Sequence, residues 1–336
     1  MTPLSVLDLS SIVQGGTVAA ALHESLAAAR LAERLGFQRF WVAEHHNMPG
    51  VASAATSVVI GHIAAGTQKI RVGAGGIMLP NHSPYVIAEQ FGTLDALFPG
   101  RIDLALGRAP GSDGLAQRAL RRDPSSSEQF PQDVLELQAW FREPEAGQRV
   151  RAVPGAGARI PLWILGSSLF GAQLAATLGL PYAFASHFAP AALMQAIALY
   201  RAQFKPSEQL DRPYVMLGLP VIAADTDREA KRLQTSIVQT LIMLRTGNPG
   251  PLMPPDEQVW DRVGPAERSM VDNMLACAVV GSPATVRRGL QEFAARTGAD
   301  ELILTGQMYE PAARLHSLEI IADVAGLGST SSVAGP

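Results

Sequence analysis

Short apolar, β-branched segments alternate with longer segments of helical periodicity along this chain of 336 residues. Nearly every apolar segment is followed by a helical pattern. Continuously apolar strands between helices are typical of a parallel sheet covered on both faces. Eight such strands at this chain length predict an α/β fold, a closed (β/α)8 barrel, as a single domain over residues 1–325. The predicted strands are 4–9, 40–43, 70–79, 102–107, 162–165, 182–185, 215–222 and 302–305.

The repeat is interrupted between the seventh and eighth predicted strands. Two helices are predicted there, at 227–245 and 283–296, and Gly281-Ser282-Pro283 marks the start of the helix that returns to the barrel. Residues 223–280 are therefore predicted to be an insertion on the C-terminal face, where such barrels hold their active sites. Residues 248–255 carry four prolines and no periodicity. They are interpreted as a lid or binding loop, or as a passive surface excursion. Residues 326–336 are predicted to be a flexible tail.

Composition excludes several classes of protein. Hydrophobic residues make up 47% of the chain and charged residues 17%, which excludes disorder of the whole chain. A formal net charge of −3 gives no electrostatic case for nucleic acid or anionic membrane as a partner. The single cysteine, Cys277, excludes an internal disulfide and a cysteine-built metal site. Residues 160–200 lack Asp, Glu, Lys and Arg, but three prolines divide them into pieces too short for a membrane span. A soluble cytoplasmic protein is expected.

Histidines follow the second predicted strand in the run Trp41-Val42-Ala43-Glu44-His45-His46-Asn47. A histidine here faces the expected active-site mouth, where its near-neutral pKa suits acid/base work. Adjacent His45 and His46 are expected to point to opposite sides, so that only one of them enters the mouth. The alternative is that both only hydrogen-bond loop backbone.

Glycines cluster in the third predicted strand, Gly73-Ala74-Gly75-Gly76-Ile77-Met78. They do not form a dinucleotide-binding motif, because Met78 stands where a third glycine is needed and no helix opens there. Glycines inside a central strand mark a bulge or the close approach of a flat ligand, or else tight packing between strands.

Two loops after neighbouring strands predict an anion site. Arg108 follows the fourth strand in Gly107-Arg108-Ala109-Pro110-Gly111-Ser112, where its guanidinium suits a bidentate grip on phosphate. In Leu165-Gly166-Ser167-Ser168-Leu169 the fifth strand turns directly into a helix, whose free N–H groups favour an anion. Capping of that helix by Ser167 or Ser168 is the structural alternative. The geometry predicts a phosphate-bearing ligand between strands four and five.

The other histidines and the cysteine carry less information. His62 lies in an apolar helix and is interpreted as a partly buried structural residue. His82 and His187 each follow a strand and are candidates for ligand contact. Cys277 has no evident activating neighbour, which argues against a catalytic thiol.

The chain resembles the bacterial luciferase-like flavin monooxygenases, in their single-chain, group-one-like branch. The resemblance rests on 41–46, on Ile70-Arg71-Val72-Gly73-Ala74-Gly75-Gly76-Ile77-Met78-Leu79-Pro80, on 100–108 and on the segments at 162–169 and 185–188. It implies a TIM barrel that uses reduced FMN, supplied by a separate flavin reductase, and O2 to oxygenate a small organic substrate. It also implies a homodimer.

The resemblance further implies roles for individual residues. His45 matches a proton-transfer residue beside the reactive part of the flavin. Gly75-Gly76 matches a non-proline cis peptide in a bulge against the flavin ring. The residues implied in cofactor binding are Ala74, Gly75 and Gly76 at the ring, Arg108 at the phosphate, and Gly166, Ser167 and Phe170 with their backbone amides.

Three alternatives remain open from the sequence. A deazaflavin on the same fold would give a hydride-transferring oxidoreductase, and a barrel that only binds flavin would have no activity. A metal-dependent hydrolase would need a site built on His45, His82 and His187, for which the sequence offers no convincing ligand set. No metal is therefore expected. The segment 246–270 does not resemble the mobile loop of the luciferases, so the substrate stays undetermined.

Overall fold

Eight parallel strands close into a ring. The computed structural model describes residues 2–109, 111 and 113–328. Each strand pairs in parallel with the next, and the pairs β6–β7, β7–β9 and β9–β1 complete the closure, which confirms the predicted (β/α)8 barrel. The ring consists of β1 (Leu4–Asp8), β2 (Arg39–Val42), β3 (Arg71–Met78), β4 (Ile102–Gly107), β5 (Leu162–Gly166), β6 (Tyr182–Phe184), β7 (Val215–Ala223) and β9 (Glu301–Thr305).

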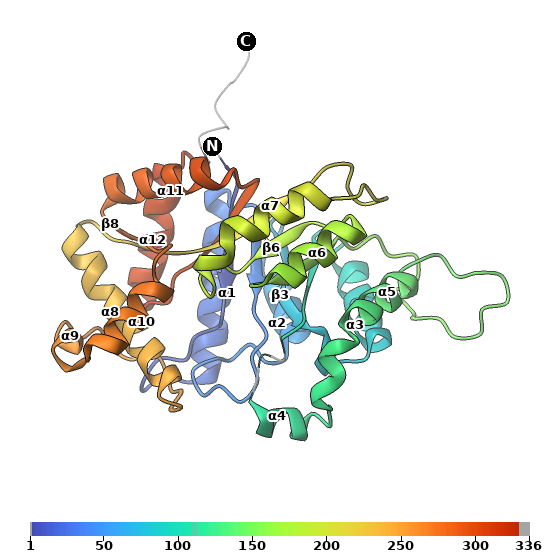
Figure 1. Ribbon diagram of the computed structural model, residues 1–336, viewed down its shortest axis with the longest axis horizontal. Helices are drawn as coiled ribbons and strands as arrows, with labels where there is room; N and C mark the ends of the chain where they lie inside the picture. The colour runs from blue at the N-terminus through green and yellow to red at the C-terminus, as the bar shows by residue number, and fades with distance from the viewer. Residues whose placement is uncertain (1, 110, 112, 329–336) are drawn as a thin grey trace, which may run out of the picture.

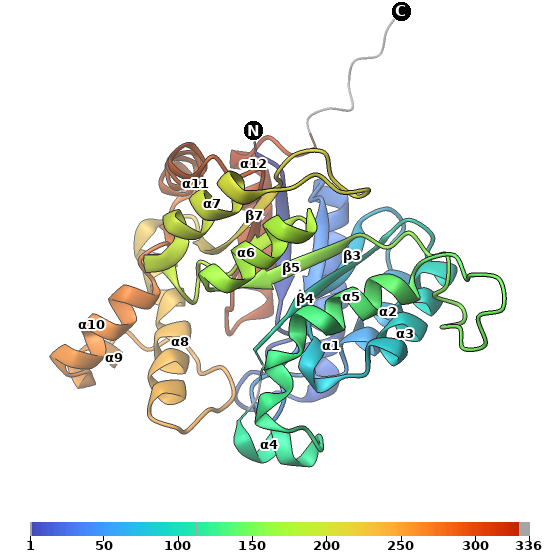
Figure 2. The ribbon, with the colours of Figure 1, turned by 45° about the vertical axis from the view of Figure 1, so that its right-hand side comes forward.

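Helices surround the ring of strands (Figures 1 and 2). The first helix is capped at both ends: the Thr17 hydroxyl accepts a hydrogen bond from the Ala20 N–H, and Gly36 ends the helix with a φ of +87°. Pro84 begins a later helix, where Ser83 makes no side-chain cap bond. The outer helices are α1 (Val18–Leu35), α2 (Thr56–Ala65), α3 (Pro84–Leu97), α5 (Phe130–Trp140), α6 (Leu169–Leu178), α7 (Leu193–Gln203), α11 (Pro283–Thr297) and α12 (Pro311–Val324).

The insertion after β7 adds four elements on one side of the barrel (Figure 1). They are α8 (Asp227–Arg245), α9 (Val259–Arg262), α10 (Pro265–Met274) and β8 (Val279–Gly281). The strand β8 pairs in parallel with the end of β7 and lies outside the ring, and the sequence did not predict it. Other short elements were also not predicted: α4 (Gly114–Ala119) and the 3-10 turns η1 (Leu79–Asn81), η2 (Pro124–Glu128) and η3 (Pro190–Ala192).

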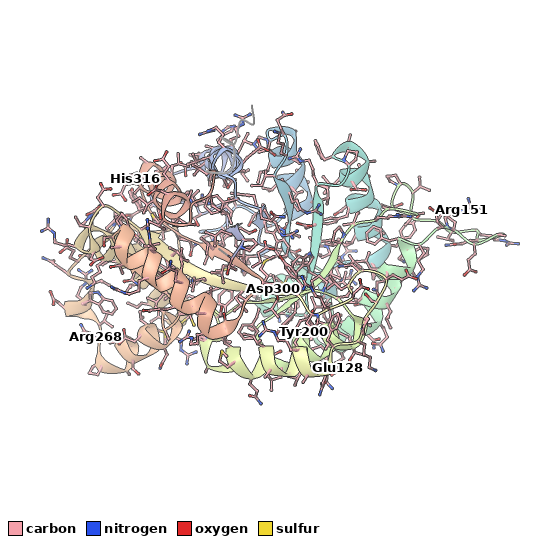
Figure 3. All side chains as sticks on the ribbon, turned by 90° about the horizontal axis from the view of Figure 1, so that it is seen from above. Glu128, Arg151, Tyr200, Arg268, Asp300 and His316 are labelled. Atoms are coloured by element: carbon pink, nitrogen blue, oxygen red, sulfur yellow. The ribbon has the colours of Figure 1, made fainter. Side chains whose placement is uncertain are left out.

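A long arm between α5 and β5 projects from the body of the molecule. Arg151 on this arm and Arg268 on α10 lie at opposite ends of the molecule (Figure 3). The base of the arm packs against α3, where Gly92 and Gly155 approach so closely that a Cβ on Gly92 would lie 2.2 Å from the Gly155 Cα. At the C-terminus, the Leu327 N–H donates to the Ala322 carbonyl. The rest of the predicted tail, 329–336, lies outside the described residues. Within the described part of the chain, none of the helices is both long and apolar enough to cross a membrane.

An ion network fills the N-terminal end of the barrel interior. Asp103 and Glu301 are completely buried, and Arg39 lies between them with contacts of 2.8 Å and 2.9 Å. Asp103 also pairs with Arg71 at 2.6 Å and accepts a hydrogen bond from the Trp41 indole. Two hydroxyls, those of Tyr214 and Ser5, donate to Glu301. The network therefore fills the end of the barrel that lies opposite the C-terminal ends of the strands.

Candidate active site

A cavity of about 1000 Å³ opens at the C-terminal ends of the strands. This volume is at the upper end of the range of about 300–1,000 Å³ that is typical of ligand sites. Leu7 and Trp41 in the barrel interior lie at its base, and the ends of β2, β3, β4 and β5 form one side. Residues of the insertion form another part of the wall. The cavity is large enough for a cofactor and a second molecule together.

Six of the eight predicted site residues line this cavity: His45, Gly75, Arg108, Gly166, Ser167 and Phe170. Ala74 and Gly76 do not. The Ala74 side chain packs in the core outside the barrel interior, so only its backbone can reach the cavity. The peptide bond between Gly75 and Gly76 is cis, and the pairing of β3 with β4 shifts register between Gly75 and Ile77.

Packing between strands explains two of the three glycines in β3. A Cβ on Gly73 would lie 2.6 Å from the Asp103 Cβ, so this glycine makes room for the ion network. A Cβ on Gly76 would lie 2.5 Å from the Ala105 carbonyl oxygen. Gly75 alone of the three also lines the cavity, and a Cβ on it would lie 2.7 Å from Leu7 Cδ1 and 3.1 Å from the Trp41 Cβ. Side-chain packing therefore accounts for Gly75 as well, and the approach of a ligand remains an interpretation for this glycine alone.

The loops after β4 and β5 converge. The Arg108 guanidinium carbon lies 4.2 Å from the centre of the Phe170 ring, in the first turn of α6. Ser168 occupies the N-cap position of α6 but makes no side-chain cap bond, so the predicted alternative of capping by this serine is wrong. The helix N-terminus and the arginine thus form one positively polarised corner of the cavity. Pro110 and Ser112, which belong to the predicted Arg108 loop, lie outside the described residues.

Two histidines line the cavity with lowered pKa values. Burial lowers the pKa of His45, although its hydrogen bond to the Gly111 backbone and the nearby Glu44 charge oppose this effect. Burial and the neighbouring His45 lower the pKa of His187 to about 4. Gly218 makes room for His187, since a Cβ there would lie 2.5 Å from Nδ1. Both imidazoles are therefore neutral at neutral pH and can accept a proton.

Glu44 holds two other histidines and was not singled out from the sequence. Its Oε1 lies 2.8 Å from the Nε2 atoms of both His46 and His82, and its Oε2 accepts a hydrogen bond from the Met78 N–H.

The expectation that only one of His45 and His46 faces the mouth is wrong, because both line the cavity. The metal-hydrolase alternative would need His45, His82 and His187 together, but His82 bonds Glu44 and does not line the cavity with the other two. Among the described residues, the group with metal-ligand spacing is Glu44, His46 and His82.

The buried Glu44 carboxylate gives a prediction for stability at low pH. Burial alone would raise the pKa of Glu44, but hydrogen bonds from His46 and His82 and the Met78 N–H lower it from 4.5 to about 2. The ionised group therefore stabilises the folded chain above pH 4.5 and loses this contribution as the pH falls toward 2. The contribution is roughly 3 kcal/mol. We expect urea unfolding between pH 7 and 2.5 to show a shallower pH dependence for Glu44→Gln than for the wild type; equal slopes would contradict the assignment.

The loop at 248–255 of the insertion lines the cavity and contacts two loops of the barrel. Leu252 exchanges two backbone hydrogen bonds of 2.8 Å with Ile12 and Gln14 in the loop after β1. A Cβ on Gly50 would lie 2.4 Å from the Gly250 carbonyl oxygen, so the loop after β2 also touches it. Leu252 is buried and lines the cavity. The interpretation of this segment as a lid or binding loop stays a prediction.

Comparison with known proteins identifies relatives over nearly the whole chain. A family model described as luciferase-like monooxygenase matches residues 3–301. An Escherichia coli (strain K12) luciferase-like monooxygenase is 53% identical over 321 residues, which are 95% of this chain and 96% of the relative. A Bacillus subtilis N-acetyl-S-alkylcysteine monooxygenase is 36% identical over 254 residues, 74% of this chain and 75% of the relative. The crystal structure of apo-MsnO8 has a TM-score of 0.90 at 38% identity and covers 97% of this chain and 99% of its own.

Proposed function

The chain belongs to the luciferase-like monooxygenase family, and from this we propose that it is an FMN-dependent monooxygenase that uses O2 to oxygenate a small organic substrate. The observation that carries the proposal is the stacking of Arg108 on Phe170 at the N-terminus of α6, in the same cavity as His45. Reduced FMN would supply the electrons that activate dioxygen. Supply of this cofactor by a separate reductase and assembly as a homodimer are further parts of the proposal, supported by the family resemblance.

The residues present fit FMN. Arg108 and the free N–H groups at the start of α6 suit a phosphate dianion, because a guanidinium and a helix N-terminus both favour negative charge. Gly75 lines the cavity, at the position where the family resemblance places the flavin ring.

His45 is proposed as the proton-transfer residue. It follows β2, lines the cavity, and has a pKa below its usual value, so its imidazole is neutral and can accept a proton at the start of a cycle. Burial and the neighbouring His45 lower the pKa of His187 to about 4, so this second imidazole is neutral as well. The protein therefore positions one ready base, His45, with a second neutral imidazole beside it.

Parallel titrations test the choice of cofactor. We expect the purified protein to bind reduced FMN under anaerobic conditions at least tenfold more tightly than a reduced deazaflavin. The reverse order would make the chain a deazaflavin-dependent oxidoreductase. Admission of 18O2 to the complex of the protein with reduced FMN and hexyl methyl sulfide, in the presence of catalase, should then yield the 18O-labelled sulfoxide. Mass spectrometry detects this product. Tight FMN binding without oxygenation of any substrate tried would favour a barrel that only binds flavin.

Replacement of Arg108 gives a prediction for cofactor affinity. Loss of charge-assisted hydrogen bonds to a phosphate costs about 1.5–3 kcal/mol, so Arg108→Ala should weaken FMN binding by roughly 10- to 150-fold. Riboflavin, which lacks the phosphate, serves as the matched ligand: its affinity should change less than threefold. Fluorescence titration of both ligands measures the effect. An equal loss of affinity for FMN and riboflavin would contradict the assignment of Arg108 to the phosphate.

A further inference from the structure

The part of the cavity wall that the insertion provides is uncharged. Residues 223–280 contain fourteen charged side chains. None of them lines the cavity in this segment, which the structure describes throughout. The side chains of the insertion that line the cavity are largely aliphatic. They include Ile237, Leu241 and Leu244 of α8, Leu252 of the loop at 248–255, Met274 of α10 and Val280 of β8. The insertion therefore directs its charges outward and its apolar side chains inward.

This apolar wall lies across the barrel from the predicted flavin face. In the closed ring, β7 is four strands away from β3 in either direction, so the two strands are opposite each other. Gly75 belongs to β3, and the insertion begins at the end of β7. A ring system placed against Gly75 would leave the space beside α8 and β8 for a second molecule. The insertion thus forms the wall that this second molecule contacts.

The cavity offers no cation to a negatively charged second molecule. Arg108 is the single Arg or Lys among the described lining residues, and it lies at the phosphate corner beside Phe170. The carboxylates of Asp113 and Glu128 line the cavity as well and would repel an anion. Burial of an unpaired ionised group in an apolar site is strongly unfavourable. A substrate carboxylate or sulfonate would therefore be left without a partner.

We infer that the substrate is an uncharged, predominantly apolar organic molecule whose body lies against Leu241, Leu252 and Val280. Gln234 and Thr240 are the polar side chains that the insertion adds to this wall, so the substrate has room for one neutral polar group, such as a carbonyl or a thioether. Both the reaction and the binding preference rest on the proposed function, because Arg108 is assigned to the phosphate of FMN and not to the substrate.

A pair of matched ligands tests the inference. Hexyl methyl sulfide and 6-(methylsulfanyl)hexanoate share a chain and differ in charge. Isothermal titration of the full-length protein, with and without oxidised FMN, should give at least tenfold tighter binding of the neutral thioether. Equal or tighter binding of the carboxylate would overturn the inference.

Variants of the wall should change this preference in a defined direction. Leu241→Lys places a cation in the cavity. It should lower the ratio of the affinity for the neutral thioether to the affinity for the carboxylate at least tenfold. Asn273→Lys adds the same charge at an exposed position beside Met274 and should leave the ratio unchanged. Leu244→Lys, at the more exposed end of the helix, replaces Leu241→Lys if circular dichroism shows that the latter is unfolded. An unchanged ratio in the folded wall variant would also refute the inference.

The same titrations separate this inference from the proposed function. Tight binding of the neutral thioether by a protein that does not bind FMN would refute the proposed function and leave the inference standing. Tight FMN binding without discrimination between the two thioethers would leave the proposed function standing and refute the inference.

Discussion

Replacement of His45 with Asn is expected to lower the rate of hexyl methyl sulfide oxygenation by about 10²- to 10⁴-fold, the usual effect of removing a positioned acid/base group. His45 lines the cavity, and burial holds its pKa below its usual value, so that the wild-type imidazole is neutral and ready to accept a proton. Asn preserves hydrogen-bonding capacity and approximate size but cannot carry a proton. Affinity for FMN should therefore change little, and the loss should appear in the rate.

The neighbouring histidine provides the control for this prediction. His46 is next to His45 in the sequence, but its ring bonds Glu44 at 2.8 Å. His46→Asn is expected to lower stability and to leave the oxygenation rate within about tenfold of the wild type. Rates of 18O-sulfoxide formation with photochemically reduced FMN, measured at saturating cofactor, compare the three proteins. If His46→Asn lost as much rate as His45→Asn, the role assigned to His45 would be wrong.

Replacement of Asp103 with Ala is expected to lower the free energy of unfolding by about 3–5 kcal/mol, as when one partner of a buried ion pair is removed. Asp103 is fully buried and accepts contacts from Arg39, Arg71 and the Trp41 indole. Without it, the Arg71 guanidinium loses its one carboxylate partner among the described residues, and Arg39 keeps only Glu301. The network would then hold two guanidinium groups against the single carboxylate of Glu301, so one positive charge would lose its counter-charge.

Urea unfolding followed by circular dichroism at pH 7 measures this loss. Asp103→Asn should be intermediate, because it keeps the volume and part of the hydrogen bonding. An exposed pair is the comparison: Glu229 contacts Arg232 at 2.8 Å on the surface of α8, and Glu229→Ala should cost no more than about 1 kcal/mol. A fall of less than 1 kcal/mol for Asp103→Ala would show that the network adds no stability.

The sequence predicts the barrel well because each ring strand is a continuous apolar run between helices. The bounds of β4 and α8 agree residue for residue with the predicted 102–107 and 227–245. The strand β8 was missed because it has three residues and its pairing with β7 depends on where the insertion returns. The helix α4 was missed because Gly114–Ala119 is too short to show apolar periodicity.

The site was predictable where it depends on neighbouring strand ends and not where it depends on side-chain contacts across strands. Arg108 and Phe170 meet because β4 and β5 are adjacent, which the strand order already implies. Glu44 was missed because its partner His82 is 38 positions away, and nothing in the local sequence shows that the two meet. For Gly73 the sequence left tight packing between strands as one alternative, and only the pairing of β3 with β4 places this glycine against Asp103.

The insertion leaves and rejoins the barrel at a single point, because β8 pairs with β7 at Val221–Val279, Ile222–Val280 and Ala223–Gly281. Its two ends are therefore adjacent, and the ion network that holds the opposite end of the barrel shares no residue with it. Residues 224–278 should therefore be exchangeable between barrels of this architecture when the backbone contacts of Leu252 with Ile12 and Gln14 are kept. A chimaera built at these junctions should keep the flavin corner of the recipient and acquire the selectivity of the donor.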